Sequence, residues 1–336
     1  MKKVSALLFA FVLLLASCRA NNTAEDGASD AESDYVIAAI TVATPDTLDR
    51  GSYDSRIEYG YDSQKRVVSE KVYYNKILCS ECNIVYEGEL PVSKHDVTVN
   101  GSGGESDTVY SYSGTKLIKE TTTYSSADKS NGAANITVNK DYSYDSEGRI
   151  VKTVESNPTD PDNRSVQEYS YNDDGTYSVK TALFVGEAEN HSNLEVYQRS
   201  ENVTDAERFK GLNVNKLTDF DRLIQSGSKN AVNYKYGYDE HGSRNRIIWL
   251  DANGSTLTEY EIANTYDEHG NLVRALYTLI KSSTPENIGT TKEDIYEYSY
   301  DEHGNMLSKH TLSGYIGYQQ YEFFEYIDLN EKSADK

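Results

Sequence analysis

The chain has 336 residues and a formal net charge of −21. A surface this acidic repels phosphate backbones, which excludes nucleic acid as a natural partner. Hydrophobic residues make up 37% of the sequence, and 29 tyrosines against seven phenylalanines supply much of the apolar surface. Because tyrosine covers an apolar face while its hydroxyl stays in water, the composition favours half-exposed β-sheet over a thick dry core.

The first segment has the pattern of an export signal. Two lysines precede an apolar run over residues 4–14 that is too short to span a bilayer. The run ends at Leu15-Ala-Ser-Cys18, which resembles the lipobox of bacterial lipoproteins. The resemblance implies cleavage after residue 17, acylation of Cys18 as the membrane anchor, and outer-membrane sorting because Arg19 follows. The alternative is an ordinary secretory peptide with a coincidental cysteine.

The next segment lacks the residues needed for a core. Residues 19–34 contain no aromatic or branched apolar side chain, so we expect a flexible acidic tether. The expected organisation is a signal peptide at 1–17, a lipidated tether at 18–34, a β domain at 35–328 and a polar tail at 329–336.

A short phrase recurs through the rest of the chain. It consists of a tyrosine pair, an acidic or amide turn residue, a glycine and then an apolar residue, and its fullest copy runs from Tyr298 to Met306. The second tyrosine of each copy lies at position 61, 112, 144, 171, 238, 266 or 300. Tyr-x-Tyr places both rings on one face of a strand, since side chains alternate with period two.

The residues after each tyrosine pair predict a hairpin turn. Aspartate starts a turn by bonding its own backbone two residues on, and glycine takes the positive φ that closes it. Lys65 replaces the glycine in the first copy, so we expect an altered or strained turn there. The predicted turn residues are Asp62, Asp145, Gly148, Gly175, Asp239, Gly242, Asp267, Gly270, Asp301 and Gly304.

Hairpin joined to hairpin predicts an all-β fold. We expect an antiparallel meander of about fourteen to eighteen strands forming a long curled sheet. One stretch departs from the pattern: Thr204-Asp-Ala-Glu207 matches a capping box, and apolar residues follow at helical spacing. This predicts one or two short helices within 204–226, against the alternative of a degenerate repeat through Phe220-Asp-Arg-Leu223.

The recurring phrase resembles the YD repeat of the RHS family over roughly residues 53–326. In large RHS proteins such repeats form a coiled β-sheet shell around a toxic C-terminal domain. This chain has few units, no core-processing segment and no trailing toxin domain, and is more similar to small YD-repeat lipoproteins of Gram-negative envelopes. The resemblance implies a fold and a surface role but no reaction.

Two residue sets are candidate sites. Cys79 and Cys82 have Cys-x-x-Cys spacing without a second pair, which favours a local disulfide at a hairpin tip over structural zinc, with free thiols as the alternative. His241, His269 and His303 occupy one turn position in three repeats. They form either a metal-binding ladder or a copied, solvated turn, and we predict no metal and no cofactor.

No catalytic motif accompanies these residues: a nucleophile elbow, a zinc-protease helix and a phosphate loop are all missing from the sequence. We therefore expect an envelope binding or scaffolding protein, not an enzyme, that recognises a protein or glycan through tyrosine-rich strands. The alternatives are a glycan-active envelope enzyme with two convergent carboxylates, and a shell-like domain that encloses a partner protein.

Overall fold

The computed structural model describes residues 35–99, 103–126, 135–228 and 233–329. From Tyr35 onward the chain forms one compact unit. The predicted signal peptide, Cys18, the tether and most of the polar tail lie outside the described residues. Within the described ranges, no helix is both long enough and apolar enough to cross a membrane.

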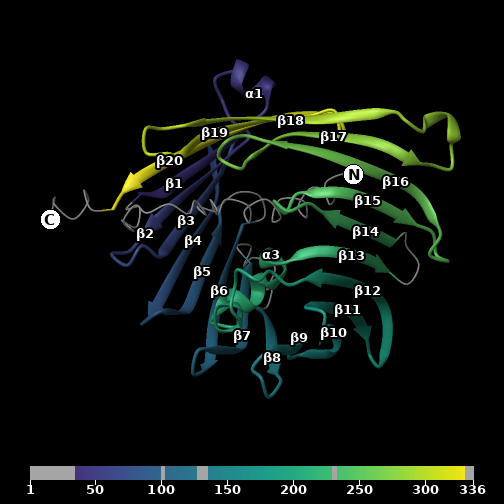
Figure 1. The fold of residues 1–336 in the computed structure, drawn as a ribbon. Helices are drawn as coiled ribbons and strands as arrows, with labels where there is room; N and C mark the ends of the chain where they lie inside the picture. The colour runs from purple at the N-terminus through teal and green to yellow at the C-terminus, as the bar shows by residue number, and fades with distance from the viewer. Residues whose placement is uncertain (1–34, 100–102, 127–134, 229–232, 330–336) are drawn as a thin grey trace, which may run out of the picture. The chain divides into compact units, whose positions relative to one another are not determined.

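The described chain contains strands β1 to β20, shown in chain order in Figure 1. The first ten strands are β1 (Tyr35–Ala43), β2 (Ser55–Tyr61), β3 (Val67–Tyr74), β4 (Ile77–Glu87), β5 (Leu90–Thr98), β6 (Gly104–Ser113), β7 (Lys116–Ser126), β8 (Ile136–Tyr144), β9 (Ile150–Asn157) and β10 (Asp160–Tyr171). The second ten are β11 (Thr176–Val185), β12 (Ala188–Gln198), β13 (Arg222–Ser228), β14 (Asn233–Tyr238), β15 (Arg244–Leu250), β16 (Thr256–Tyr266), β17 (Leu272–Lys281), β18 (Thr291–Tyr300), β19 (Met306–Ser313) and β20 (Tyr318–Asp328). The helical segments are α1 (Pro45–Asp49), α2 (Asp205–Arg208), η2 (Leu212–Lys216), α3 (Leu217–Phe220) and η3 (Pro285–Asn287).

The sheet is closed. Each strand pairs antiparallel with its neighbours in the chain, and β1 also pairs with β20, from Tyr35 opposite Asp328 to Ala43 opposite Tyr321. The predicted long curled sheet of repeated hairpins is therefore wrong, because the structure is a closed 20-strand antiparallel β-barrel. Closure pairs the edge N–H and C=O groups that a curled sheet leaves exposed.

The two edges of the barrel carry different connections. The turns of the recurring phrase all follow even-numbered strands, so they lie together at one edge, which we term the YD edge. One further Asp-x-x-Gly turn, from Asp251 to Gly254, follows β15 and lies at the opposite edge. The connections that follow odd-numbered strands lie at the opposite edge, the link edge. Alternation of strand direction in an antiparallel sheet produces this segregation.

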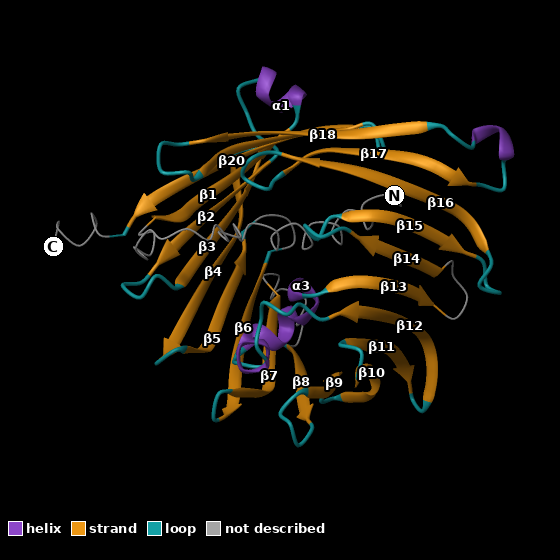
Figure 2. Cartoon of the chain, viewed as in Figure 1, coloured by secondary structure: helices purple, strands orange, loops and turns teal. Residues whose placement is uncertain are grey.

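The two faces of the sheet also differ. The inner face is the one against which α2, η2 and α3 pack, inside the ring of strands in Figure 2. It carries three apolar clusters rich in tyrosine. The buried members of these clusters are Leu117, Tyr142, Ile150, Phe209, Val214, Leu217, Tyr177, Val179, Tyr197, Ile247, Ile262 and Ala275.

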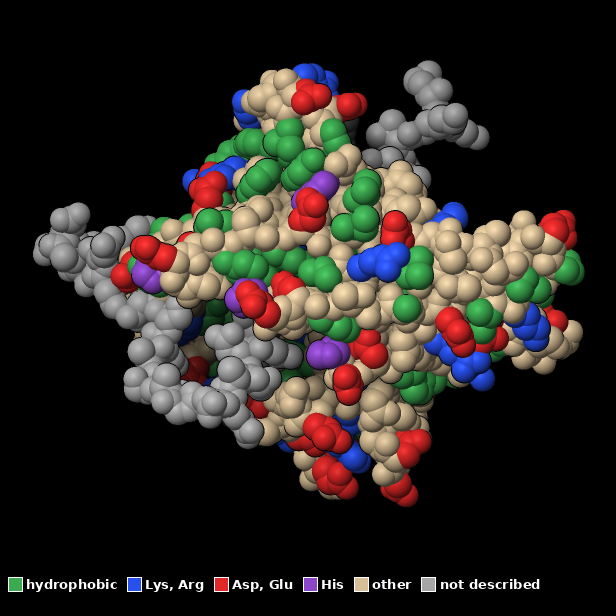
Figure 3. All heavy atoms as spheres, turned by 45° about the horizontal axis from the view of Figure 1, so that its top comes forward, with side chains coloured by type: hydrophobic (Ala, Val, Ile, Leu, Met, Phe, Trp, Pro, Cys, Tyr) green, Lys and Arg blue, Asp and Glu red, His purple; other side chains and the backbone are tan. Residues whose placement is uncertain are grey.

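The outer face carries cross-strand ion pairs. Lys152 lies 3.6 Å from Glu168 on the neighbouring strand, and Arg274 lies 2.8 Å from Glu293. The alternation of side chains places these residues opposite the tyrosine-bearing face. In Figure 3, acidic and basic side chains are interspersed over one face of the molecule.

The 204–226 interval contains both a helical and a strand segment. Thr204 accepts a hydrogen bond from the Glu207 backbone N–H, and Glu207 accepts one from the Thr204 N–H at 2.9 Å, which forms the capping box before α2. β13 then begins at Arg222. Leu223 lies opposite Tyr197, just as the apolar residue after a turn of the recurring phrase lies opposite the second tyrosine before that turn. The helical insert, residues 199–221, thus takes the place of one four-residue turn.

Candidate functional site on the inner face

The turn aspartates act through their backbone contacts. The carboxylate of Asp145 accepts hydrogen bonds from the backbone N–H groups of residues 147 and 149 at 3.0 and 2.8 Å, and Asp62, Asp267 and Asp301 make the same pair of bonds. Burial alone raises the pKa of Asp145, but the hydrogen bonds from Arg149 and the turn backbone hold it below its ordinary value. These carboxylates are engaged in holding the turns.

The turn glycines take the positive φ that their position requires. Gly148, Gly175, Gly242, Gly270 and Gly304 have φ between 77° and 85°. Lys65, at the equivalent place in the first repeat, has φ of 60°, so a side chain occupies the left-handed region there.

The turn histidines pack on tyrosines. Two of them lie against the second tyrosine of the next repeat: His241 on Tyr266 at 4.1 Å, and His269 on Tyr300 at 4.7 Å between ring centroids. His303 lies 5.1 Å from Tyr35. Within the described residues, no group of three or more His, Cys, Asp or Glu side chains is placed to hold a metal ion.

In other repeats an arginine four residues after the turn aspartate stacks on the next tyrosine. The Arg66 guanidinium carbon lies 4.3 Å from the ring centroid of Tyr86, and that of Arg149 lies 4.6 Å from Tyr171. A stack between a turn side chain and the next tyrosine therefore runs along the YD edge, and it gives the histidines a packing role.

The tyrosine hydroxyls join successive hairpins. Tyr144 donates to the Leu117 carbonyl at 2.6 Å, and Tyr171 donates to the Ile150 carbonyl at 2.9 Å. Leu117 and Ile150 lie beside register shifts in their own hairpins, where the backbone ladder is interrupted. The hydroxyl thus satisfies a carbonyl next to the bulge. Similar bonds join Tyr61 to Ile37, Tyr86 to Val67, Tyr112 to Pro91, Tyr238 to Leu223 and Tyr298 to Leu272.

Cys79 and Cys82 both lie on β4 and are thiols in the structure, so the disulfide predicted at a hairpin tip is not formed. A strand rises about 3.3 Å per residue, which separates positions three apart by more than the roughly 7 Å that a disulfide spans. Cys82 is buried on the inner face, and this burial raises the pKa of its thiol to about 12.

The helical insert covers part of the inner face. Arg208 and Asp221 form an ion pair inside it, and each side chain is only 1% exposed. The insert reaches the sheet where Asn215 accepts a hydrogen bond from the Tyr142 hydroxyl at 2.6 Å, and where the Gly211 N–H donates to the Thr115 carbonyl at 2.8 Å. The insert therefore packs over strands from β12 back to the β6–β7 turn.

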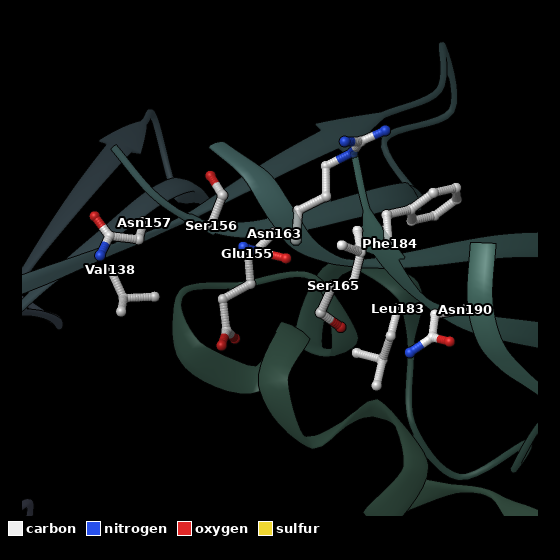
Figure 4. A pocket seen from close by; sticks show the side chains of 11 residues that line it. Val138, Glu155, Ser156, Asn157, Asn163, Ser165, Leu183, Phe184 and Asn190 are labelled. Atoms are coloured by element: carbon white, nitrogen blue, oxygen red, sulfur yellow. The ribbon is translucent and has the colours of Figure 1, made fainter. Parts of the chain in front are cut away.

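Two hollows lie beside the clusters. The rim hollow, about 390 Å³, is an open depression near the link edge of β8 to β12. In Figure 4, Glu155, Ser165 and Leu183 point to one side of the sheet, and Ser156 and Phe184 point to the other. This hollow mixes amide, hydroxyl and apolar side chains around one carboxylate.

The tyrosine hollow, about 200 Å³, lies on the inner face between β15 and β20. Tyr277, Tyr296, Tyr315 and Tyr318 line it, together with Asp294. Burial raises the pKa of Tyr296 to about 12, so its phenol is neutral at pH 7. Each hollow presents a single carboxylate among its lining residues, whereas glycoside hydrolysis uses a pair.

The sequence prediction missed the residues that build the tyrosine hollow. Tyr315 lies in the β19–β20 connection, outside any tyrosine pair, and Asp294 lies within β18. The one signal in the sequence was that Asp294 departs from the repeat, because the recurring phrase has no acidic residue at an inward-facing strand position.

Comparisons with known proteins leave the family open. No protein-family model matches the chain, and no curated protein matches it. A solved porin-like protein from Bacteroides uniformis ATCC 8492 has 11% identity and a TM-score of 0.31, with 87% of this chain and 96% of that chain covered. A porin-like protein from Bacteroides vulgatus ATCC 8482 has 12% identity and a TM-score of 0.30, with 87% and 98% covered.

A third structure, TcdB2-TccC3 without its hypervariable C-terminal region, has 12% identity and a TM-score of 0.15, with 76% of this chain and 18% of that chain covered. Similarity at this level carries no argument about what the present protein does.

Proposed function

We propose that the protein is a lipid-anchored binding protein of the bacterial outer membrane, whose tyrosine hollow holds a terminal group of a protein or glycan partner. The observation that supports this most directly is the lining of the hollow, where the rings of Tyr277, Tyr296 and Tyr315 lie beside the buried carboxylate of Asp294. Binding sites for small groups combine apolar walls with a few placed polar atoms in this way.

The outer face supports attachment by a lipid over insertion of the barrel. A bilayer-spanning barrel presents an apolar band outward, and one basic side chain at the bilayer midplane costs about 2–4 kcal/mol. Here the outer face carries pairs such as Lys152–Glu168, whose side chains are 44% and 55% exposed. We therefore propose that the barrel stands in water and that acylated Cys18 provides the anchor.

The test is ligand binding by the purified lipidated protein in detergent, measured by titration calorimetry against panels of soluble glycans and peptides. For any ligand found, Tyr315→Ala is expected to weaken binding about tenfold, roughly 1.4 kcal/mol. Tyr124→Ala is the matched control, because Tyr124 is 50% exposed and lies away from the hollow. Equal affinity of Tyr315→Ala and the unaltered protein for every ligand would refute the assignment.

A further inference from the structure

We propose that the tyrosine hollow binds an organic ammonium group, with Asp294 as its counter-ion. This inference rests on the proposed function and names the chemistry of the group held at that site. It comes from three features found together: a buried carboxylate that has no cationic partner, a hollow beside it, and several aromatic rings.

Asp294 is a buried acid without a cationic partner. It is 6% exposed, and no Lys, Arg or His nitrogen of the described chain lies within 4.0 Å of its carboxylate. Its Oδ1 accepts hydrogen bonds from the Ser313 hydroxyl at 2.5 Å and the Tyr315 N–H at 3.2 Å, and the Tyr277 hydroxyl also bonds the carboxylate. All three donors are neutral. Because a carboxylate has about four acceptor positions, capacity remains for a charged donor. Buried charges in proteins are ordinarily paired, so an external cation completes the site.

The space next to Asp294 follows from its neighbours in the sheet. Its cross-strand partners are Ala275 on β17 and Ser313 on β19, two small side chains. The neighbouring inward positions carry large rings, Tyr277 and Tyr296. Small residues around the acid and large ones beyond it leave a half-open space of about 200 Å³. This volume is below the roughly 300 Å³ of pockets for drug-sized ligands, which limits the occupant to a small group.

Aromatic rings surround the space on the side away from the sheet. Tyr315 folds back over the inner face and stacks on Tyr277, with 4.5 Å between ring centroids and 19° between planes. It also meets Tyr260 edge to face at 5.5 Å. Tyrosine faces attract ammonium groups, and this attraction is strongest where water is excluded.

The cations already present nearby are engaged elsewhere. Lys292 lies 5.8 Å from the ring centroid of Tyr315 and bonds the Tyr315 carbonyl at 3.3 Å, and it does not line the hollow. Arg244 does line the hollow, but its guanidinium carbon lies 4.4 Å from the Tyr236 ring. The rings of this region therefore already attract cations, while the carboxylate of Asp294 has none.

The experiment compares choline with its uncharged carbon isostere, in which a tert-butyl group replaces trimethylammonium, by titration calorimetry on the purified lipidated protein. We expect choline to bind at least about tenfold more tightly than the isostere. Asp294→Asn is expected to remove that preference. Glu297→Gln, an exposed acid on the outer face of the same strand, is expected to retain it and serves as the matched control.

The outcomes separate this inference from the proposed function. If the isostere binds as tightly as choline, or if Glu297→Gln loses the preference as Asp294→Asn does, the hollow is not an ammonium site, although it still binds a ligand. If choline, the isostere and all members of the glycan and peptide panels fail to bind, both proposals are wrong. Because Asp294 also holds the β19–β20 connection, Tyr318→Leu provides a second variant, expected to weaken choline binding without removing the carboxylate.

Discussion

The ion pair between Arg208 and Asp221 provides the sharpest test of how the helical insert is held. Asp221 accepts two bonds from one guanidinium nitrogen, at 2.6 and 2.7 Å, and both side chains are 1% exposed. The guanidinium also donates to the carbonyls of Ser200 at 2.6 Å and Val203 at 3.1 Å. Each of the three guanidinium nitrogens thus has an acceptor, and only one of the partners is charged.

Asp221→Ala removes that charged partner and leaves a buried guanidinium uncompensated. Breaking one side of a buried pair costs about 3–5 kcal/mol, a large part of a typical domain's total of roughly 5–15 kcal/mol. We expect a loss in this range from the free energy of unfolding, measured by urea denaturation followed by far-UV circular dichroism. Replacing both partners by apolar residues, Arg208→Met with Asp221→Leu, is expected to cost much less, because no charge is then left buried.

The matched control is an exposed pair. Glu168→Ala breaks the 3.6 Å contact with Lys152 on the outer face, and exposed pairs contribute about 0–1 kcal/mol. If Asp221→Ala destabilises the protein no more than Glu168→Ala, burial of the pair does not control the stability of the insert, and the argument fails.

Three further predictions concern the repeats. Tyr144→Phe removes one hydroxyl hydrogen bond between hairpins and is expected to lower the free energy of unfolding by about 0.5–1.5 kcal/mol. The control Tyr124→Phe, at a half-exposed ring, should change this free energy by less than about 0.5 kcal/mol. Equal effects in denaturant titrations would contradict the role of the hydroxyl. Lys65→Gly removes the strain of a side chain at a left-handed φ, which is worth about 1 kcal/mol, and part of this gain is offset by the entropy that glycine adds to the unfolded chain. The thermal midpoint of unfolding should therefore rise, and a lower midpoint would show that the turn is not strained. Because the folded-state pKa of Asp145 is lowered, its contribution to stability is complete above the unfolded value of about 3.9 and is lost as pH falls through the folded pKa. The free energy of unfolding of Asp145→Asn should therefore fall less steeply below about pH 4 than that of the unaltered protein. If the two proteins lose stability in parallel as pH falls, this carboxylate is not a source of acid sensitivity.

The turns could be located from the sequence because their chemistry is local. An aspartate bonds the N–H two residues on, and a glycine such as Gly148 takes positive φ within its own turn. The capping box at Thr204 is equally local. Such features depend on neighbours within about four residues, and the residue types alone identify them.

Closure and the tyrosine hollow could not be predicted in the same way. β1 lacks the repeated phrase, and its pairing with β20 joins residues from opposite ends of the domain. Asp294 meets Ser313 and Tyr315 only because register and a connection bring three segments together. The packing of the turn histidines could not be predicted for a related reason, since the stacking of His241 on Tyr266 depends on how adjacent hairpins align.

The pairing of β1 with β20 has a consequence for biogenesis. If the chain is exported as proposed, it emerges progressively, and the strand that begins at Tyr35 has its second partner only when the strand ending at Asp328 has also emerged. Until then β1 presents an unpaired edge to the crowded envelope, and such edges pair readily with other chains. Contacts this distant in sequence also form slowly. We therefore expect maturation to depend on a periplasmic holdase that shields the first strand, and chains truncated before β20 to aggregate through it.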